Sequence, residues 1–197
     1  MYADDINILI IQNDVHALQR KTEKVISDLE WWVNKNNLII NVKKTGIMAF
    51  HNRQEKVPIK PKVTLNGSSL EYVADLKFLG IYITETLNWN IHLQSLAHKL
   101  SKVSFMIKTL KETFSPYMIR HIYFTKFQAI LRSGILLWGG IKGDSSIRVF
   151  KTQKRVVRLL AGLSLRTSCR QLFKKLNILT MASSYILEVT CFIRKNC

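Results

Sequence analysis

The first half of the chain alternates short apolar runs with turn residues, a pattern typical of strands. One stretch differs, because its apolar-face positions recur every three or four residues, at Leu18, Thr22, Val25, Leu29 and Trp32. That spacing predicts an amphipathic helix with Asn13-Asp14 as its N-cap and Asn36-Asn37 at its end. The predicted strands are residues 6–11, 38–42, 47–50, 63–65, 70–73 and 78–84. Asn66-Gly67 favours a tight hairpin turn between two of them.

From Asn88-Trp89 onward the apolar spacing changes to that of long helices. Ser115 followed by Pro116 predicts a helix start, and Gly139-Gly140 predicts its end. Asp144 and Gly162 bound another predicted helix, while Thr167 and Thr180 are candidate caps for later ones. The sequence therefore predicts an α+β chain. Residues 1–88 would hold short antiparallel strands with one or two helices, and residues 89–197 would be all α.

Charge separates the two halves further. The chain has 30 Lys and Arg against 13 Asp and Glu, and residues 89–197 hold 19 of these basic residues but only 3 of the acidic ones. A block with that imbalance indicates a polyanionic partner, either nucleic acid or an anionic membrane surface. In the helix after Asp144 the basic residues share one arc; they are Arg148, Lys151, Arg155 and Arg158. The alternative is a solvated face, and the core-like opposite side disfavours a membrane.

An acidic pair, Asp4-Asp5, stands directly before the apolar run 6–11. Carboxylates beside a buried strand need a neutralising partner, and a hard divalent cation with oxygen ligands fits that need. A solvated acidic turn is the alternative. Two-metal chemistry also needs a carboxylate from another strand, whereas the next acidic residues lie on the predicted helix. We therefore expect only half of such a metal site in this sequence.

The remaining residues that could carry chemistry are scattered. Three cysteines without C-x-x-C spacing indicate a reduced, intracellular setting, and no zinc site is predicted from them or from the five histidines. The four tryptophans are typical of a core more than of base stacking. The longest apolar stretch is too short to span a bilayer, and no basic region opens a signal peptide.

The motifs, taken in order, resemble the C-terminal part of the reverse transcriptase of a non-LTR retrotransposon, most like the Jockey type. Tyr2-Ala3-Asp4-Asp5 is similar to the catalytic box of that family, and Trp32 with residues 38–45 is similar to its next palm motif. Residues 78–81, followed by 87–89 and His92, resemble the primer-grip hairpin of the family and the entry to its thumb. The later matches are residues 137–139, residues 153–155 with Arg158, and Cys169 with residues 172–173 and 176–180. The resemblance implies a partial polymerase palm over 1–88 and a thumb-like region over 89–197.

The resemblance also implies roles. Asp4 would bridge two Mg²⁺ ions with Asp5 as an auxiliary carboxylate, and Lys44 would act near the leaving pyrophosphate unless it is a plain solvated lysine. Tyr2 and Ala3 would line the approach of the primer end. The implied primer grip is Phe78, Leu79 and Gly80. The implied nucleic-acid-binding residues are Tyr2, Arg148, Lys151, Lys154, Arg155 and Arg158.

The sequence departs from the family because the fingers, the first catalytic aspartate and the endonuclease would all precede Met1. We expect a fragment of an RNA-directed DNA polymerase that is inactive alone, with RNA template and DNA primer, or duplex nucleic acid, as partners. The resemblance implies the cytoplasm and nucleus as its location. Three function classes stay open: an enzyme fragment complemented by an upstream chain, a non-catalytic nucleic-acid-binding module, and a transposon relic without function.

Overall fold

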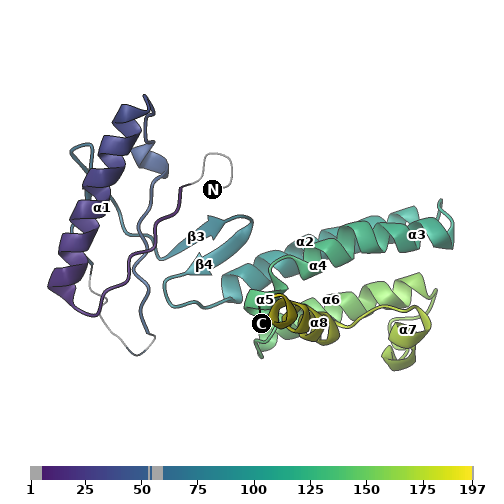
Figure 1. Ribbon diagram of the computed structural model, residues 1–197. Helices are drawn as coiled ribbons and strands as arrows, with labels where there is room; N and C mark the ends of the chain where they lie inside the picture. The colour runs from purple at the N-terminus through teal and green to yellow at the C-terminus, as the bar shows by residue number, and fades with distance from the viewer. Residues whose placement is uncertain (1–5, 53, 55–59, 197) are drawn as a thin grey trace. The chain divides into compact units, whose positions relative to one another are not determined.

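The structure, a computed structural model, describes residues 6–52, 54 and 60–196. Its fold is α+β, with two small two-stranded sheets followed by helices, so the predicted fold class is confirmed. The chain divides into two compact units (Figure 1). We call them the N-terminal unit, Met1–Lys77 with Ile83–Leu87, and the helical unit, Phe78–Tyr82 with Asn88–Cys197.

The N-terminal unit is built around one long helix, α1 (Val15–Lys35). Asp14 caps it, because its carboxylate accepts a hydrogen bond from the Ala17 N–H at 2.8 Å. Asn37 follows the helix with a φ of +53°, the left-handed conformation that ends helices. The predicted amphipathic helix and both of its end signals are confirmed. A short 3₁₀ helix, η1 (Val42–Lys44), comes next.

Two hairpins complete this part of the chain. β1 (Thr64–Leu65) pairs antiparallel with β2 (Ser68–Ser69), and the turn between them is Asn66-Gly67 with φ values of +49° and +73°. Positive φ at both turn residues is the type I′ geometry that Asn-Gly favours. β3 (Asp75–Phe78) pairs with β4 (Ile81–Thr84). The predicted strand 78–84 is therefore wrong in its start, since a turn at Leu79-Gly80 divides it.

Four other strand predictions are wrong or reduced, and one of them, 70–73, keeps only Tyr72 in an isolated bridge. Residues 6–11 and 38–42 form no strand, and Leu9, Ile11 and Ile39 are 73%, 70% and 95% exposed. Their apolar character predicts strands, but a strand also needs a neighbour for its backbone N–H and C=O groups. Within the described residues neither segment has such a neighbour. Residues 47–50 are reduced to a single parallel bridge between Ile47 and Tyr72.

The helical unit contains every helix after the hairpins. They are α2 (Asn90–Leu110), α3 (Pro116–Ile122), the π-helical turn η2 (Tyr123–Gln128), α4 (Ala129–Arg132), α5 (Ile135–Trp138), α6 (Asp144–Leu160), α7 (Arg170–Lys175) and α8 (Met181–Asn196). The Ser115 and Thr180 caps are confirmed, because their hydroxyls accept from Met118 N at 3.4 Å and Ser183 N at 3.1 Å. Thr167 caps no helix, since α7 starts three residues later with Cys169 at its N-cap.

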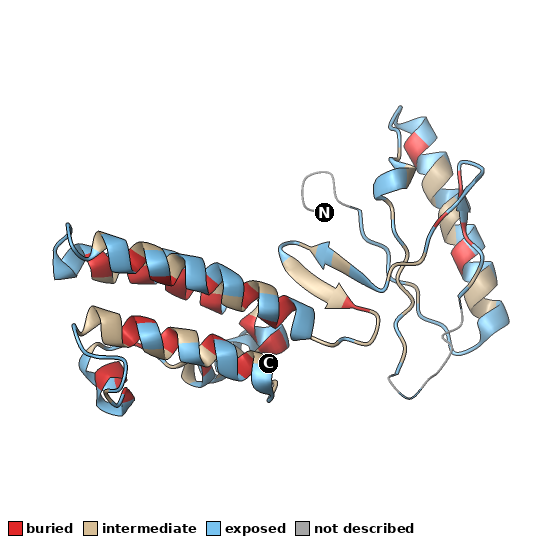
Figure 2. Cartoon of the chain, turned by 180° about the vertical axis from the view of Figure 1, so that it is seen from behind, coloured by how far each residue is buried: buried red, intermediate tan, exposed pale blue. Residues whose placement is uncertain are grey.

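The core of this unit lies between α2 and α6, which pack along their lengths. Figure 2 shows the buried residues on the facing sides of these two long helices. Leu100, Ile107, Val149 and Val156 have no exposed surface there. Trp138 is also fully buried, as predicted. The core prediction is wrong for Trp31 and Trp32 of α1, which are 62% and 42% exposed.

None of the described helices combines the length and the apolar content needed to cross a bilayer.

Candidate nucleic-acid interface

The outer face of α6 carries a row of cations. Arg148, Lys151 and Arg155 follow one another at steps of three and four residues, and all three are exposed. We call these three residues the α6 basic row. The opposite side of the helix is buried, with Val149 and Val156 fully inside the core. No ion pair between the row and a carboxylate exists within the part of the chain that the structure describes. The row is therefore available to an external anion.

Two further α6 residues that were predicted to bind nucleic acid make contacts within the protein. Arg158 is half-buried, and its Nε donates to the Thr167 carbonyl at 2.6 Å, which holds the loop before α7. Lys154 is also half-buried, with Nζ 4.8 Å from the centre of the Phe150 ring. The structure thus gathers all five predicted α6 residues on one helix but leaves only Arg148, Lys151 and Arg155 fully exposed.

The predicted primer grip forms the tip of the β3–β4 hairpin and belongs to the helical unit. Leu79 and Gly80 are its turn residues, with φ values of +46° and +85°, and Leu79 is 51% exposed. The tip is tied to α2, because the Tyr82 N–H donates to His92 Nδ1 at 3.4 Å. Burial, together with the nearby Lys99 charge, lowers the pKa of His92, which keeps the ring neutral and able to accept.

Close packing at Gly134 also holds the hairpin. A Cβ atom placed on Gly134 would come within 2.5 Å of Ile81 Cδ1, so any other residue here would push the Ile81 side chain at the hairpin tip aside. Gly134 is also the N-cap of α5, and its φ of +64° lies in the left-handed region. The sequence analysis missed this role. A lone glycine within a long apolar stretch was the available signal.

The predicted catalytic and metal residues are not brought together by what the structure describes. Asp4, Asp5 and Tyr2 lie outside the described residues. Lys44 is exposed at the last position of η1. Among residues 6–52, 54 and 60–196, no three His, Cys, Asp or Glu side chains group as a metal ion requires. The described residues therefore do not fit a Mg²⁺ site by themselves.

Three curated Drosophila proteins match long stretches of this chain. The 115 kDa protein of the type-1 retrotransposable element R1DM of Drosophila melanogaster is 29% identical over 125 residues, 62% of this chain. The RNA-directed DNA polymerase of the mobile element jockey of Drosophila funebris is 27% identical over 110 residues, 54% of this chain. The probable RNA-directed DNA polymerase of transposon BS of Drosophila melanogaster is 24% identical over 183 residues, 91% of this chain. The chain is similar to retrotransposon RNA-directed DNA polymerases.

The resemblance inferred from the motifs is confirmed at the level of this relationship. The chain spans only a small part of these relatives, because the matched stretches cover 12%, 20% and 12% of the R1DM, BS and jockey proteins. No family model and no solved structure matches the chain.

Gln153 organises a buried polar cluster that was not predicted from the sequence. It has no exposed surface, and its Nε2 donates to the Leu179 carbonyl at 2.9 Å and toward the Tyr123 hydroxyl at 3.4 Å. Its Oε1 accepts from the Met181 N–H at 2.9 Å, at the start of α8. The signal was available, since a glutamine on the apolar side of α6 has to find buried partners.

Tyr123 completes this cluster from η2. Its hydroxyl donates to Gln128 Oε1 at 2.9 Å. Burial raises the pKa of Tyr123 to about 12, against a smaller lowering by the hydrogen bond from Gln153. The cluster is therefore a neutral, structural one that joins α6, η2 and the start of α8.

Proposed function

We propose that the helical unit holds duplex nucleic acid for a retrotransposon reverse transcriptase, as its thumb. The observation that carries this proposal is the α6 basic row, which is exposed and forms no ion pair with any described residue, in a region with 19 basic and 3 acidic residues. Residues 148 to 155 span about 10 Å of helix, the length of about three base-pair steps of a duplex. Such a row can follow phosphates along one strand without reading sequence.

In the same proposal the N-terminal unit is the end of the polymerase palm, so the chain is the C-terminal part of the parent polymerase. Asp4 and Asp5 would be Mg²⁺ ligands for two-metal nucleotidyl transfer, Lys44 would act at the leaving group, and Phe78, Leu79 and Gly80 would hold the primer. The homology of the jockey and BS polymerases supports this assignment. The protein would work in the cytoplasm and nucleus.

Salt dependence tests the thumb assignment. If about five phosphates are neutralised, a plot of log K against log salt should slope near −4.5 on duplex DNA, so fourfold more salt weakens binding by roughly 500-fold. Replacing Arg148 and Arg155 with Gln should flatten the slope by about 0.9 for each lost contact, equally for all sequences.

Arg132→Gln is the matched control. Arg132 is an arginine of the same unit whose Nε donates to Glu188 at 2.9 Å, so its charge is already paired. Its removal should leave the slope unchanged. An unchanged slope in the Arg148 and Arg155 variant would show that the α6 basic row is only a solvated face, and the thumb assignment would then be dropped.

Primer extension separates an enzyme fragment from a non-catalytic binding module. We expect no extension of a primer on RNA by this chain alone, because it spans so little of its relatives. Supplying the upstream part of a related polymerase, fused before Met1 or as a second chain, should restore extension if the chain is a polymerase fragment. That activity should disappear in Asp4→Ala. Extension by the chain alone that Asp4→Ala abolishes would contradict the expectation of inactivity, and failure of every complemented form would favour the binding module.

A further inference from the structure

The outward side of α3 and η2 carries exposed aromatic rings. Tyr117 is 69% exposed and Phe124 is 36% exposed. Their spacing of seven residues, with His121 between them, places the three rings along one side of the helical stretch. The Tyr117 and His121 rings lie 4.5 Å apart, centre to centre, in a T-shaped arrangement. The core of this same stretch is made by other residues, since Ile119 and Tyr123 are the buried ones.

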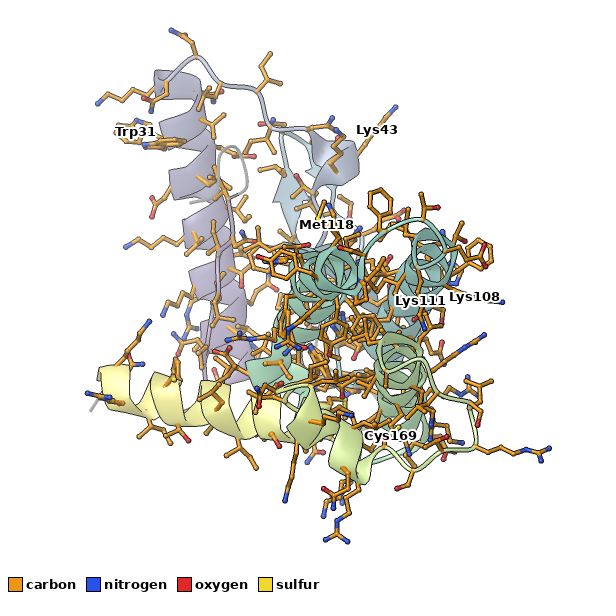
Figure 3. The ribbon with its side chains drawn as sticks, turned by 90° about the vertical axis from the view of Figure 1, so that its right-hand side faces the viewer. Trp31, Lys43, Lys108, Lys111, Met118 and Cys169 are labelled. Atoms are coloured by element: carbon orange, nitrogen blue, oxygen red, sulfur yellow. The ribbon has the colours of Figure 1, made fainter. Side chains whose placement is uncertain are left out.

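A fixed cation lies among these rings. The guanidinium carbon of Arg120 is 4.9 Å from the centre of the Phe124 ring. Arg120 also donates to the Leu176 carbonyl, which holds the guanidinium in place over the ring. The surrounding sequence has a net positive charge, because basic residues but no acidic residue occur between Glu112 and Asp144. Figure 3 looks onto this end of the helical unit, where Lys108, Lys111 and Met118 are labelled.

Exposed rings interleaved with cations suit one kind of ligand better than others. A folded protein surface of this charge repels another copy of itself, whereas unpaired nucleotides offer both phosphates and flat bases. Stacking of bases on aromatic side chains stabilises single-strand complexes, and an arginine adds cation–π attraction. A duplex presents its bases already stacked, so it gains nothing from exposed rings. Charge complementarity and ring exposure together therefore favour a single strand.

We propose that Tyr117, Arg120, His121 and Phe124 form a stacking platform for unpaired nucleotides, distinct from the α6 basic row. It rests on the proposed function only in taking nucleic acid as the ligand. The rings would stack on bases, Arg120 would hold the base or phosphate beside Phe124, and the acid-free segment around them would attract the strand. This assigns the helical unit a second site with a different ligand conformation.

The test uses the full chain with three labelled DNA probes: a single strand of about 12 nucleotides, an abasic strand of the same length, and a duplex. The variant is Tyr117→Leu with Phe124→Leu, which keeps apolar side chains but removes the rings. It should bind the normal single strand at least about tenfold more weakly than the unmodified chain. Its affinity for the abasic strand and the duplex should not change, because those probes offer no free base.

Phe192→Leu is the matched control, since Phe192 is an aromatic residue on α8 that is 56% exposed. It should leave binding of all three probes unchanged. Thermal melting of each variant checks the fold. Equal affinity of the unmodified chain for the normal and the abasic strand would overturn the platform, as would equal losses on single strand and duplex. A selective loss on the single strand would support the platform even if the α6 basic row variants left the duplex unaffected, so the two proposals fail separately.

Discussion

The side chain of Gln153 joins several elements of the helical unit. From α6 it reaches the Leu179 carbonyl, the Met181 N–H and the Tyr123 hydroxyl, with no contact to solvent. The start of α8 is positioned by two of these bonds. Because Gln153 is followed directly by Lys154 and Arg155, the same helix turn faces the core with an amide and the outside with cations.

We expect Gln153→Ala to lower the free energy of unfolding by about 2–4 kcal/mol, because it leaves buried backbone and hydroxyl groups without partners. Urea denaturation of the full chain measures this loss. Thr152→Ala is the neighbouring control, since the Thr152 hydroxyl bonds only the Arg148 carbonyl within its own helix, and it should cost under about 1 kcal/mol. If both variants lower the free energy of unfolding by the same small amount, the buried polar cluster does not stabilise the fold more than a local hydrogen bond does.

The two hairpins use the same turn with different residues. Asn66-Gly67 joins β1 and β2, and Leu79-Gly80 joins β3 and β4, with both residues of each pair at positive φ. Asparagine tolerates this conformation, whereas a leucine there is strained. Leu79 is also 51% exposed, so burial of its side chain offsets little of the backbone strain. A strained, exposed apolar residue at a hairpin tip is expected where its side chain has a role, which agrees with the proposed primer grip.

Exchanging the first turn residues tests this. Leu79→Asn should raise the free energy of unfolding by about 1 kcal/mol, since it removes left-handed strain from an exposed position. The reverse change, Asn66→Leu, should lower it by a similar amount. Thermal or urea melting measures both. If Leu79→Asn destabilises the chain instead, the leucine side chain must contribute packing that outweighs its backbone strain.

Elements with local signals could be predicted from the sequence, and elements that need a distant partner could not. The caps Asp14, Ser115 and Thr180 and the Asn66-Gly67 turn act through bonds or dihedral angles within a few residues, so they were found. The segment 6–11 has the composition of a strand but depends on a neighbour elsewhere in the chain. The apolar pattern alone predicted one strand over 78–84 because Leu79 gives no sequence signal for a turn, whereas the family resemblance implied a hairpin at 78–81.

The candidate site shows the same limit. Charge and helical spacing sufficed to place Arg148, Lys151 and Arg155 on one exposed arc. They could not show that Arg158 is bound to the Thr167 carbonyl, because that contact depends on how a loop folds back. The partners of Gln153 and the packing of Gly134 against Ile81 could likewise not be predicted from the sequence pattern, because both contacts join segments that are well separated in the sequence.

Taken over the complete chain, the two units have very unequal cores. Among the described residues, 18 buried hydrophobic side chains form the core of the helical unit, against Val63, Leu65 and Leu70 in the N-terminal unit. Burial of apolar surface is the main favourable term in folding, so stability must be distributed unevenly. The exposed apolar segments 6–11 and 38–39 add nothing to the smaller core.

Hydrogen exchange measures this difference. Backbone amides of α2 and α6 should exchange only when most of the helical unit unfolds, whereas those of residues 38–52 and 60–75 should exchange orders of magnitude faster. Mass spectrometry of peptic fragments from the full chain resolves the two sets, with the urea-unfolded chain as the reference for unprotected rates. Matching protection in both sets would mean that the units open as one cooperative body.

The π-helical turn η2 restricts how this protein can change length. Ile119, Tyr123, Phe127 and Leu131 are all buried at steps of four residues, although such steps drift by about 40° each on a regular α-helix. The wide turn at Tyr123–Gln128 takes up this drift. Deleting one residue there would close an ordinary α-helix, in which the eleven remaining steps from Ile119 to Leu131 turn by about 1100°, close to three full turns, so Leu131 would stay in the core. A relative that is one residue shorter inside 123–128 should therefore keep the same buried positions on an ordinary helix, whereas a one-residue gap in the α-helical parts on either side would turn the residues after it by about 100°.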